Sequence, residues 1–152
     1  MARMPIRLQI AAALLFTCGL AGCAGGGPAT AAETPEALFA AFDKAMVSGD
    51  YEAAAALVNY DAQASAENEN MDVTAKSQRN LISGKMKEAT VAGLKAWGWP
   101  QGGLKPDAPQ VQGDRALITA NGGGKVVSLS LANSAEGWQI VGGVPGMTSN
   151  TQ

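Results

Sequence analysis

The chain has 152 residues, of which 47% are hydrophobic, and its 11 basic and 13 acidic residues give a net charge of −2. This length allows one domain with a substantial core but not two. The basic residues are scattered and the net charge is acidic, which argues against nucleic-acid binding. The lack of histidine excludes catalytic triads of the Ser-His-Asp and Cys-His kinds, and it argues against zinc or haem sites.

The first 22 residues have the three-part layout of a secretory signal peptide. Arg3 and Arg7 precede an apolar run over residues 10–16, and small residues follow up to Cys23. The apolar run is too short for a transmembrane helix, which needs about 20 apolar residues. We therefore expect residues 1–22 to be removed from the mature protein.

The junction Leu20-Ala21-Gly22-Cys23 resembles the lipobox of bacterial lipoproteins, which consists of a branched apolar residue, two small residues and a cysteine. The resemblance implies cleavage between Gly22 and Cys23, a thioether-linked diacylglyceryl group on the Cys23 sulfur, and acylation of the new amino group. Two or more acyl chains make attachment durable, because each buried methylene contributes about 0.8 kcal/mol. An ordinary signal peptide followed by a chance cysteine is the alternative.

The mature chain is expected in the bacterial cell envelope, held to a membrane by the lipid on Cys23. Ala24 stands where an aspartate would resemble an inner-membrane retention signal, which favours the outer membrane, facing the periplasm, in a Gram-negative cell. Glycine-rich residues 23–33 predict a flexible tether. We expect one domain over residues 34–143 and a disordered tail over residues 144–152.

Two helices joined by a Gly-Asp turn are predicted at the start of the domain. Thr34 is expected to cap the first helix, whose apolar residues recur at helical spacing until Gly49 ends it. Asp50 is expected to cap the second. A third helical pattern covers residues 73–97. Two glycines in it, Gly84 and Gly93, each cost about 1 kcal/mol relative to alanine, so we expect a break or bend there.

The last third of the chain changes to the alternating pattern of half-buried strands. The predicted strands are "DRALITA", "KVVSLSL" and "GWQIV", joined by turns at residues 121–124 and 133–137, with a short strand near residues 110–112. The side chains expected to face inward are Ala116, Ile118, Ala120, Val127, Leu129, Leu131, Trp138 and Ile140. The predicted fold class is α+β, with N-terminal helices packed on a curved antiparallel sheet.

The helix pair "PEALFAAFDKAMVSGDYEAAAALV", followed later by "GDRALITA" and "KVVSLSLANSAEGWQIVGG", resembles the nuclear transport factor 2-like fold, also called ketosteroid-isomerase-like. The resemblance covers most of residues 34–143 and implies a cone-shaped sheet. Because only three strands are clear, the cone is expected to be shallow or incomplete. The ketosteroid-isomerase branch uses an acidic general base together with a tyrosine or acid that stabilises an enolate oxygen.

Asp43 or Asp61, paired with Tyr51 or Tyr60, are the candidates for such a site. Asp43 falls on the polar face of its helix and Asp61 opens a polar loop, so we interpret both as solvated acids and the tyrosines as packing residues. No catalytic residue, cofactor or metal is assigned. The acidic segment of residues 61–72 lacks the ligand spacing of a calcium loop.

The motif "AWGWP" places Trp97 and Trp99 near a helix end, where paired indoles are candidates for ligand contact. Packing across the mouth of the sheet is the commoner use of such residues. The motif "NGGGK", residues 121–125, precedes a strand rather than a helix and lacks a Ser or Thr after the lysine, so we interpret it as a hairpin turn and not as a phosphate loop.

These patterns predict a non-enzymatic binding or assembly module, whose partners are the membrane, through Cys23, and an envelope protein or small apolar ligand. The alternative is a small-molecule-binding protein or weak ketosteroid-isomerase-like enzyme with a pocket in the cone. Homodimerisation through the open sheet face is a third hypothesis. It ranks lower because Val126, Ser128 and Ser130 would make that face too polar for a large interface.

Overall fold

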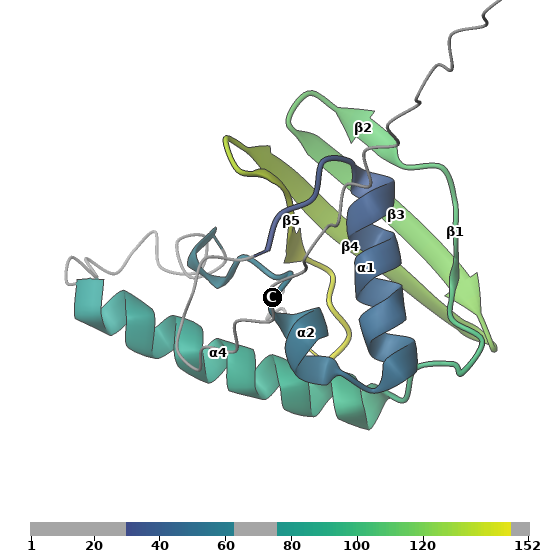
Figure 1. Cartoon of the computed structure of the whole chain (residues 1–152), viewed down its shortest axis with the longest axis horizontal. Helices are drawn as coiled ribbons and strands as arrows, with labels where there is room; N and C mark the ends of the chain where they lie inside the picture. Colours follow the sequence, from purple (N-terminus) through teal and green to yellow (C-terminus); the bar gives the residue numbers. More distant parts are fainter. Residues whose placement is uncertain (1–29, 63–75, 147–152) are drawn as a thin grey trace, which may run out of the picture.

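Figure 1 shows the computed structural model of the chain, which describes residues 30–62 and 76–146. The described residues form an α+β domain with an antiparallel sheet, as the sequence predicts, and helices pack beside this open sheet of five strands. Residues 1–29, which include the predicted signal peptide and Cys23, lie outside the described part of the chain.

The main helices are α1 (Pro35–Ser48), α2 (Tyr51–Ala55) and α4 (Lys76–Trp97). The Thr34 side chain accepts a hydrogen bond of 3.1 Å from the Ala37 amide and so caps α1. Gly49 ends α1 with a φ of 75°, in the left-handed conformation that favours glycine. Asp50 caps α2 by accepting a 3.0 Å hydrogen bond from the Ala53 amide. The predicted Gly-Asp turn and both predicted caps are confirmed.

α4 runs without interruption through 22 residues, so the predicted break at its glycines is wrong. Gly84 has nothing within 4 Å of the position that a Cβ would take, and it costs the helix only its low propensity. Gly93 has a packing reason, because a Cβ there would lie 2.9 Å from the backbone of Gly146. The missing side chain lets the segment after the sheet cross α4 at close range.

The five strands are β1 (Lys105–Pro106), β2 (Gln110–Gln112), β3 (Arg115–Gly122), β4 (Lys125–Ser134) and β5 (Gly137–Gly142). They are hydrogen-bonded in the order β1-β3-β4-β5, and β2 pairs with the other half of the β3 edge that β1 occupies. Gly122 pairs with Lys125, so residues 121–125 form a tight hairpin turn as predicted. β1 is not among the strands predicted from the sequence.

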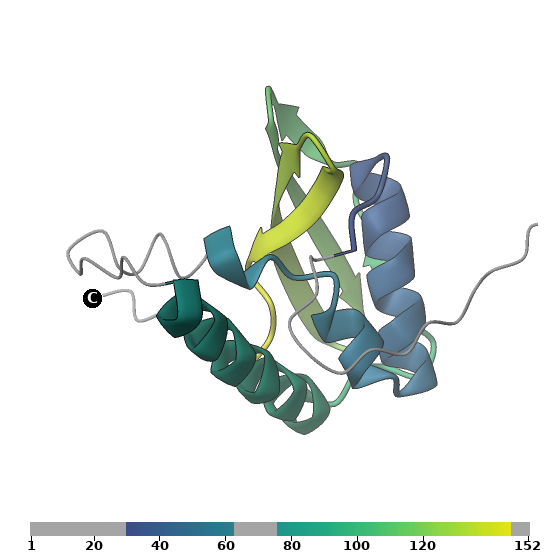
Figure 2. The same ribbon diagram turned by 60° about the vertical axis from the view of Figure 1, so that its left-hand side comes forward.

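β3 and β4 alternate between a buried and an exposed face along most of their length. All eight residues predicted to face inward are buried. α1 packs against this face, as Figures 1 and 2 show from two directions, and it contributes Leu38, Phe39, Phe42, Ala45 and Met46 to the core. The opposite face carries exposed side chains that include Leu117, Val126, Ser128 and Ser130.

The outer edge of β5 is covered by two short stretches of chain. Ala32 forms an antiparallel bridge with Trp138, and Val58 forms a parallel bridge with Ile140. Ala32 belongs to the predicted tether, and Val144, in the predicted tail, is only 3% exposed. Residues on both sides of the predicted domain boundaries therefore pack against the domain.

Candidate functional site

Trp97 and Trp99 form a corner between α4 and β1, which we call the tryptophan corner (residues 97–100). Trp97 is the last residue of α4, and Gly98, with a φ of 71°, turns the chain so that Trp99 packs against the core. The ring centroids of Trp97 and Trp99 lie 5.2 Å apart. The Trp99 ring meets the ring of Phe42 edge-on, with centroids 5.5 Å apart. Aromatic contacts thus join the end of α4 to α1.

Asp43 of α1 binds the tryptophan corner through its carboxylate. Its Oδ1 accepts hydrogen bonds from the Trp99 indole N–H and from the Leu104 backbone N–H, both at 2.8 Å. Gly103 passes so close that a Cβ there would lie 2.5 Å from Asp43 Oδ2. The prediction that Asp43 is a solvated acid is therefore wrong, because its partners come from a segment 56 to 61 residues further along the chain.

Lys125, the first residue of β4, covers the ring of Trp97. Its ammonium nitrogen lies 4.3 Å from the ring centroid and donates to the backbone carbonyls of Trp97 and Gly98. Trp97 ends α4 and Gly98 follows it, so the ammonium group lies at the C-terminal end of the helix, where the helix dipole favours a positive charge. No local pattern in the sequence indicates this role, because Lys125 and Trp97 are 28 residues apart in the chain.

The polar groups of the tryptophan corner are already occupied within the domain. The indole N–H of Trp99 binds Asp43, and Lys125 lies over Trp97. Both indoles are half-buried and packed against the core, which is the packing role that the sequence also predicted. Ligand contact by Trp97 or Trp99 remains a prediction that would use the exposed part of each ring.

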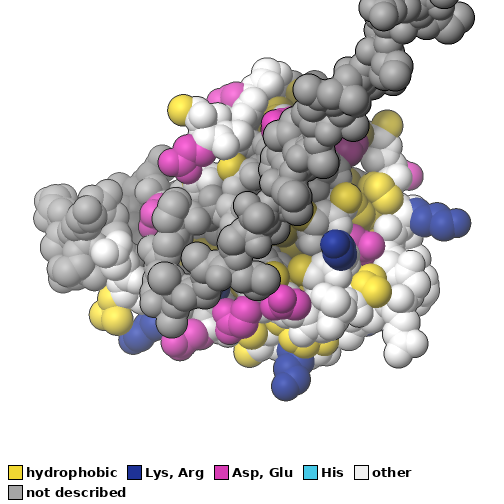
Figure 3. Space-filling view, in the orientation of Figure 1, with side chains coloured by type: hydrophobic (Ala, Val, Ile, Leu, Met, Phe, Trp, Pro, Cys, Tyr) yellow, Lys and Arg dark blue, Asp and Glu magenta, His cyan; other side chains and the backbone are white. Residues whose placement is uncertain are grey.

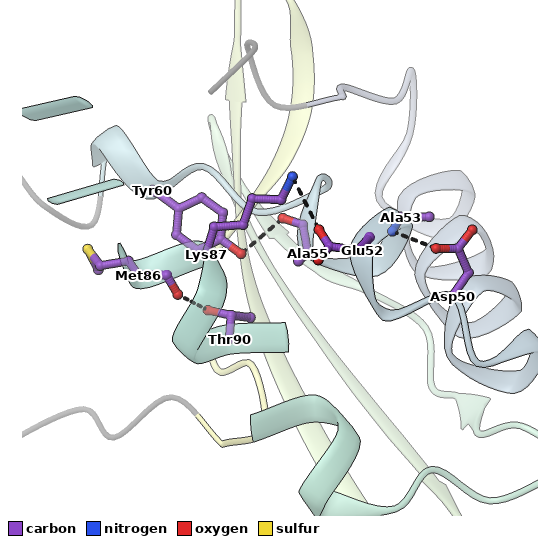
Figure 4. Close-up of polar contacts among 8 residues, drawn as sticks. All are labelled: Asp50, Glu52, Ala53, Ala55, Tyr60, Met86, Lys87 and Thr90. Atoms are coloured by element: carbon purple, nitrogen blue, oxygen red, sulfur yellow. Dashed lines mark hydrogen bonds and ion pairs between the residues drawn. The ribbon is translucent and has the colours of Figure 1, made fainter. Parts of the chain in front are cut away.

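Tyr60 lies between α2 and α4 in a second polar cluster (Figure 4). Its side chain is 8% exposed, and its hydroxyl donates to the Ala55 carbonyl at 3.0 Å. Thr90 of α4 is fully buried beside it and donates to the Met86 carbonyl at 2.8 Å. These hydrogen bonds satisfy the two hydroxyl donors where α2 and α4 meet.

Burial raises the pKa of Tyr60 to about 12. Loss of solvation is the largest cause, since it penalises the charged phenolate. The neighbouring Thr90 hydroxyl lowers the pKa of Tyr60, and the negative charge of Glu52 raises it. Tyr60 is therefore a neutral hydrogen-bond donor at neutral pH.

The free energy of unfolding is expected to fall between about pH 10 and pH 12 because of Tyr60. The unfolded chain loses the phenolic proton near the ordinary pKa of about 10, whereas the folded chain keeps it until about 12. The contribution is complete below pH 10 and is lost as the pH rises through the folded pKa, and it amounts to about 2 to 3 kcal/mol. Denaturant titrations across this range should show a smaller loss for Tyr60→Phe than for the wild type. Identical pH dependence in the two proteins would contradict the assignment.

The four candidate acids and tyrosines do not form one constellation in the described part of the chain. Asp43 binds the tryptophan corner, whereas Tyr60 binds between α2 and α4. Asp61 accepts a 2.8 Å hydrogen bond from Ser83 of α4 at the surface. Tyr51 begins α2 and is half-buried against the core.

Residues 30–62 and 76–146 contain no group of three or more Cys, Asp or Glu side chains that could hold a metal ion. Most of the acidic segment, including Glu67, Glu69 and Asp72, lies outside these ranges, as do Gly22 and Cys23 at the predicted lipidation site. Within the same ranges, no helix combines the length and the apolar character needed to cross a membrane.

The tryptophan corner and the Tyr60 cluster are the two groups of polar and aromatic side chains described above. Their contacts are structural in character, since each polar side chain in them binds the backbone or a neighbouring side chain of the domain. Neither the protein-family models, nor the curated proteins, nor the solved structures give a significant match to the chain.

Proposed function

We propose that the protein is a cell-envelope lipoprotein whose domain is a non-enzymatic binding or assembly module with a nuclear transport factor 2-like fold. The observation that carries the proposal is the lipobox pattern Leu20-Ala21-Gly22-Cys23 directly after a signal-peptide pattern. In a Gram-negative cell the mature protein would face the periplasm from the outer membrane.

The order of the elements supports the nuclear transport factor 2-like fold. The helix pair around Gly49 and Asp50 is followed by the long helix α4 and then by an antiparallel sheet on which α1 packs. β1 and β2 have only two and three residues, and a sheet with such short edge strands fits a shallow cone.

The contacts of Asp43 and Tyr60 support a module without catalytic activity. A general base needs a carboxylate that can reach the proton it abstracts, but Asp43 Oδ1 already accepts hydrogen bonds from Trp99 of the tryptophan corner and from the Leu104 amide. A stabilising tyrosine must donate to the substrate oxygen, but the Tyr60 hydroxyl donates to Ala55. The alternative, a small-molecule-binding protein or weak enzyme, gains no support from these contacts. A structure with a small molecule enclosed beside Tyr60 would favour it instead.

Cys23→Ser is expected to move the protein from the membrane fraction to soluble or uncleaved forms. Serine has no thiol to form the thioether, so the acyl chains that hold the protein to the bilayer are lost. Cell fractionation together with intact-mass measurement tests this result, and the wild type should begin at Cys23 and carry the mass of two or three acyl chains.

The chain offers a matched control in its other cysteine. Cys18 lies within the predicted signal peptide, four residues before the expected cleavage point. Cys18→Ser should therefore leave both the fractionation and the mature mass unchanged. A wild-type protein with an unacylated amino terminus at another residue would refute the proposed anchor.

A further inference from the structure

We propose that the outward side of α4 lies against the bilayer into which Cys23 is inserted, with its lysines on anionic lipid headgroups. The inference rests on the proposed lipid anchor and assigns a membrane-facing surface to the domain. We call this surface the α4 outer face, and it consists of Leu81, Lys85, Glu88, Ala92 and Lys95, all of which are exposed.

Five of the nine basic residues of the mature chain lie in the one segment that forms α4. α4 contains five basic residues and one acidic residue, a net charge of +4. The rest of residues 23–152 contains four basic and twelve acidic residues, a net charge of −8. The α4 outer face carries Lys85 and Lys95 against Glu88, so an anionic surface attracts this face more than the acidic remainder of the molecule.

The α4 outer face combines basic and apolar side chains. Thr90 and Leu94 turn into the core and are fully buried, whereas Leu81 and Lys85, on the opposite side of the helix, are exposed. α4 runs along the lower rim of Figure 1, and basic side chains project from that rim in Figure 3. The lysines of this face can bind anionic headgroups, and Leu81 offers one apolar side chain to the membrane interface. Glu88 is the one opposing charge on this face.

The predicted tether enters the domain close to α4. The Thr30 amide donates to the Ala56 carbonyl at 3.0 Å, and Ala56 is the C-cap of α2. α2 packs against α4, and Lys87 of α4 pairs with Glu52 of α2 at 3.6 Å (Figure 4). Thr30 is thus separated from the α4 outer face by two helices at most.

The length of the tether suits this arrangement. Seven residues lead from Cys23 to Thr30, and they span at most about 25 Å when extended. A helix with its side chains is about 10 Å across, so the tether can pass both helices and bring Cys23 level with the α4 outer face. Because docking is intramolecular once the lipid is inserted, a weak attraction is enough to orient the domain.

Two equally exposed positions allow a direct test. Leu81 on the α4 outer face is 62% exposed, and Val126 on the outward face of the sheet is 66% exposed. Leu81→Cys and Val126→Cys would each be made in the full lipidated protein, labelled with an environment-sensitive fluorophore and reconstituted into vesicles. The vesicles would be phosphatidylcholine alone, or phosphatidylcholine with about one third phosphatidylglycerol. Both positions are exposed, so neither substitution disturbs the core.

In anionic vesicles, the accessibility of the probe at position 81 to an aqueous quencher should fall about threefold or more. The probe at position 126 should stay accessible. Lys85→Gln should weaken this protection and Glu88→Gln should strengthen it. Equal quenching at the two positions would overturn the inference while leaving the anchor intact. Protection at position 81 without vesicles would also overturn it, because a second copy or another part of the chain would then cover the face.

The labelling itself separates failure of this inference from failure of the proposed anchor. Cys23 takes no label when its sulfur carries the diacylglyceryl thioether, so each variant should carry one fluorophore. Two fluorophores per chain, with one on Cys23, would show that the lipid is absent.

Discussion

Gly143→Ala is expected to lower the free energy of unfolding by about 4 kcal/mol or more, a loss that marks severe strain or overpacking. Gly143 has a φ of 77°, which alone costs a non-glycine residue about 1 to 2 kcal/mol. In addition, a Cβ there would lie 1.9 Å from the Ser128 carbonyl oxygen. That oxygen belongs to the backbone of β4, which is fixed by its pairing with β3. It cannot rotate away, so the chain after β5 must be displaced.

Gly124→Ala is the matched control for this prediction. Gly124 has nearly the same φ, 76°, but nothing lies within 4 Å of the position that its Cβ would take. The free energy of unfolding of this variant should therefore fall only by the conformational cost of about 1 to 2 kcal/mol. Denaturant unfolding followed by circular dichroism measures both variants. Equal losses would show that the close approach to Ser128 is unimportant.

The position of Gly143 also affects the proposed membrane-facing surface. The residues after it place Val144 in the core and carry Gly146 across Gly93 of α4. This segment therefore ties the end of the sheet to the C-terminal half of α4. A displaced segment would loosen the helix whose outer face we propose to lie on the bilayer.

Asp43→Leu is expected to lower the free energy of unfolding by about 2 to 4 kcal/mol, because it leaves two donors in a part-buried site without an acceptor. The donors are the indole N–H of Trp99 and the backbone N–H of Leu104. A leucine has the same branching and the same number of side-chain heavy atoms, so the substitution leaves no cavity at this site. Denaturant unfolding gives the stability, and the emission of the tryptophans reports whether the corner remains closed.

Asp43→Asn separates the hydrogen bonds from the charge. Both donors bind the same carboxylate oxygen, Oδ1, and the Oδ1 of an asparagine can accept both. This variant should therefore lose about 1 kcal/mol or less, which is the charge-assisted part of the interaction. If the leucine and asparagine variants were equally stable, the carboxylate would act as the solvated acid that the sequence predicted.

The attachment of α4 explains why it can present a fixed surface. Lys125 and Trp99 hold its C-terminal end, Gly93 contacts Gly146 in its second half, and Thr90 is buried beside Tyr60. Towards its N-terminal end, α4 extends beyond the sheet and the other helices (Figure 1). A helix held along one side in this way keeps its opposite side in one orientation relative to the domain.

The sequence by itself determined the features that depend on neighbouring residues. The caps at Thr34 and Asp50 each bind an amide three residues away, so the local pattern is sufficient to find them. The inward residues of β3 and β4 follow from strict alternation, because successive side chains in a strand point to opposite faces. The anchor at Cys23 remains a prediction of the same local kind, drawn from four adjacent residues.

Only the tertiary structure decided the features whose partners are distant in the chain. β1 is two residues with a proline, and it is a strand only because it pairs with β3. A glycine at position 93 lets Gly146 pass close to α4, and this contact with a distant residue is the reason for the glycine, which does not break the helix. No pattern in the neighbouring residues indicates that Asp43 accepts hydrogen bonds, since its two donors lie more than 50 residues away. Such contacts form only when the packed core brings remote segments together, and local periodicity contains no record of them.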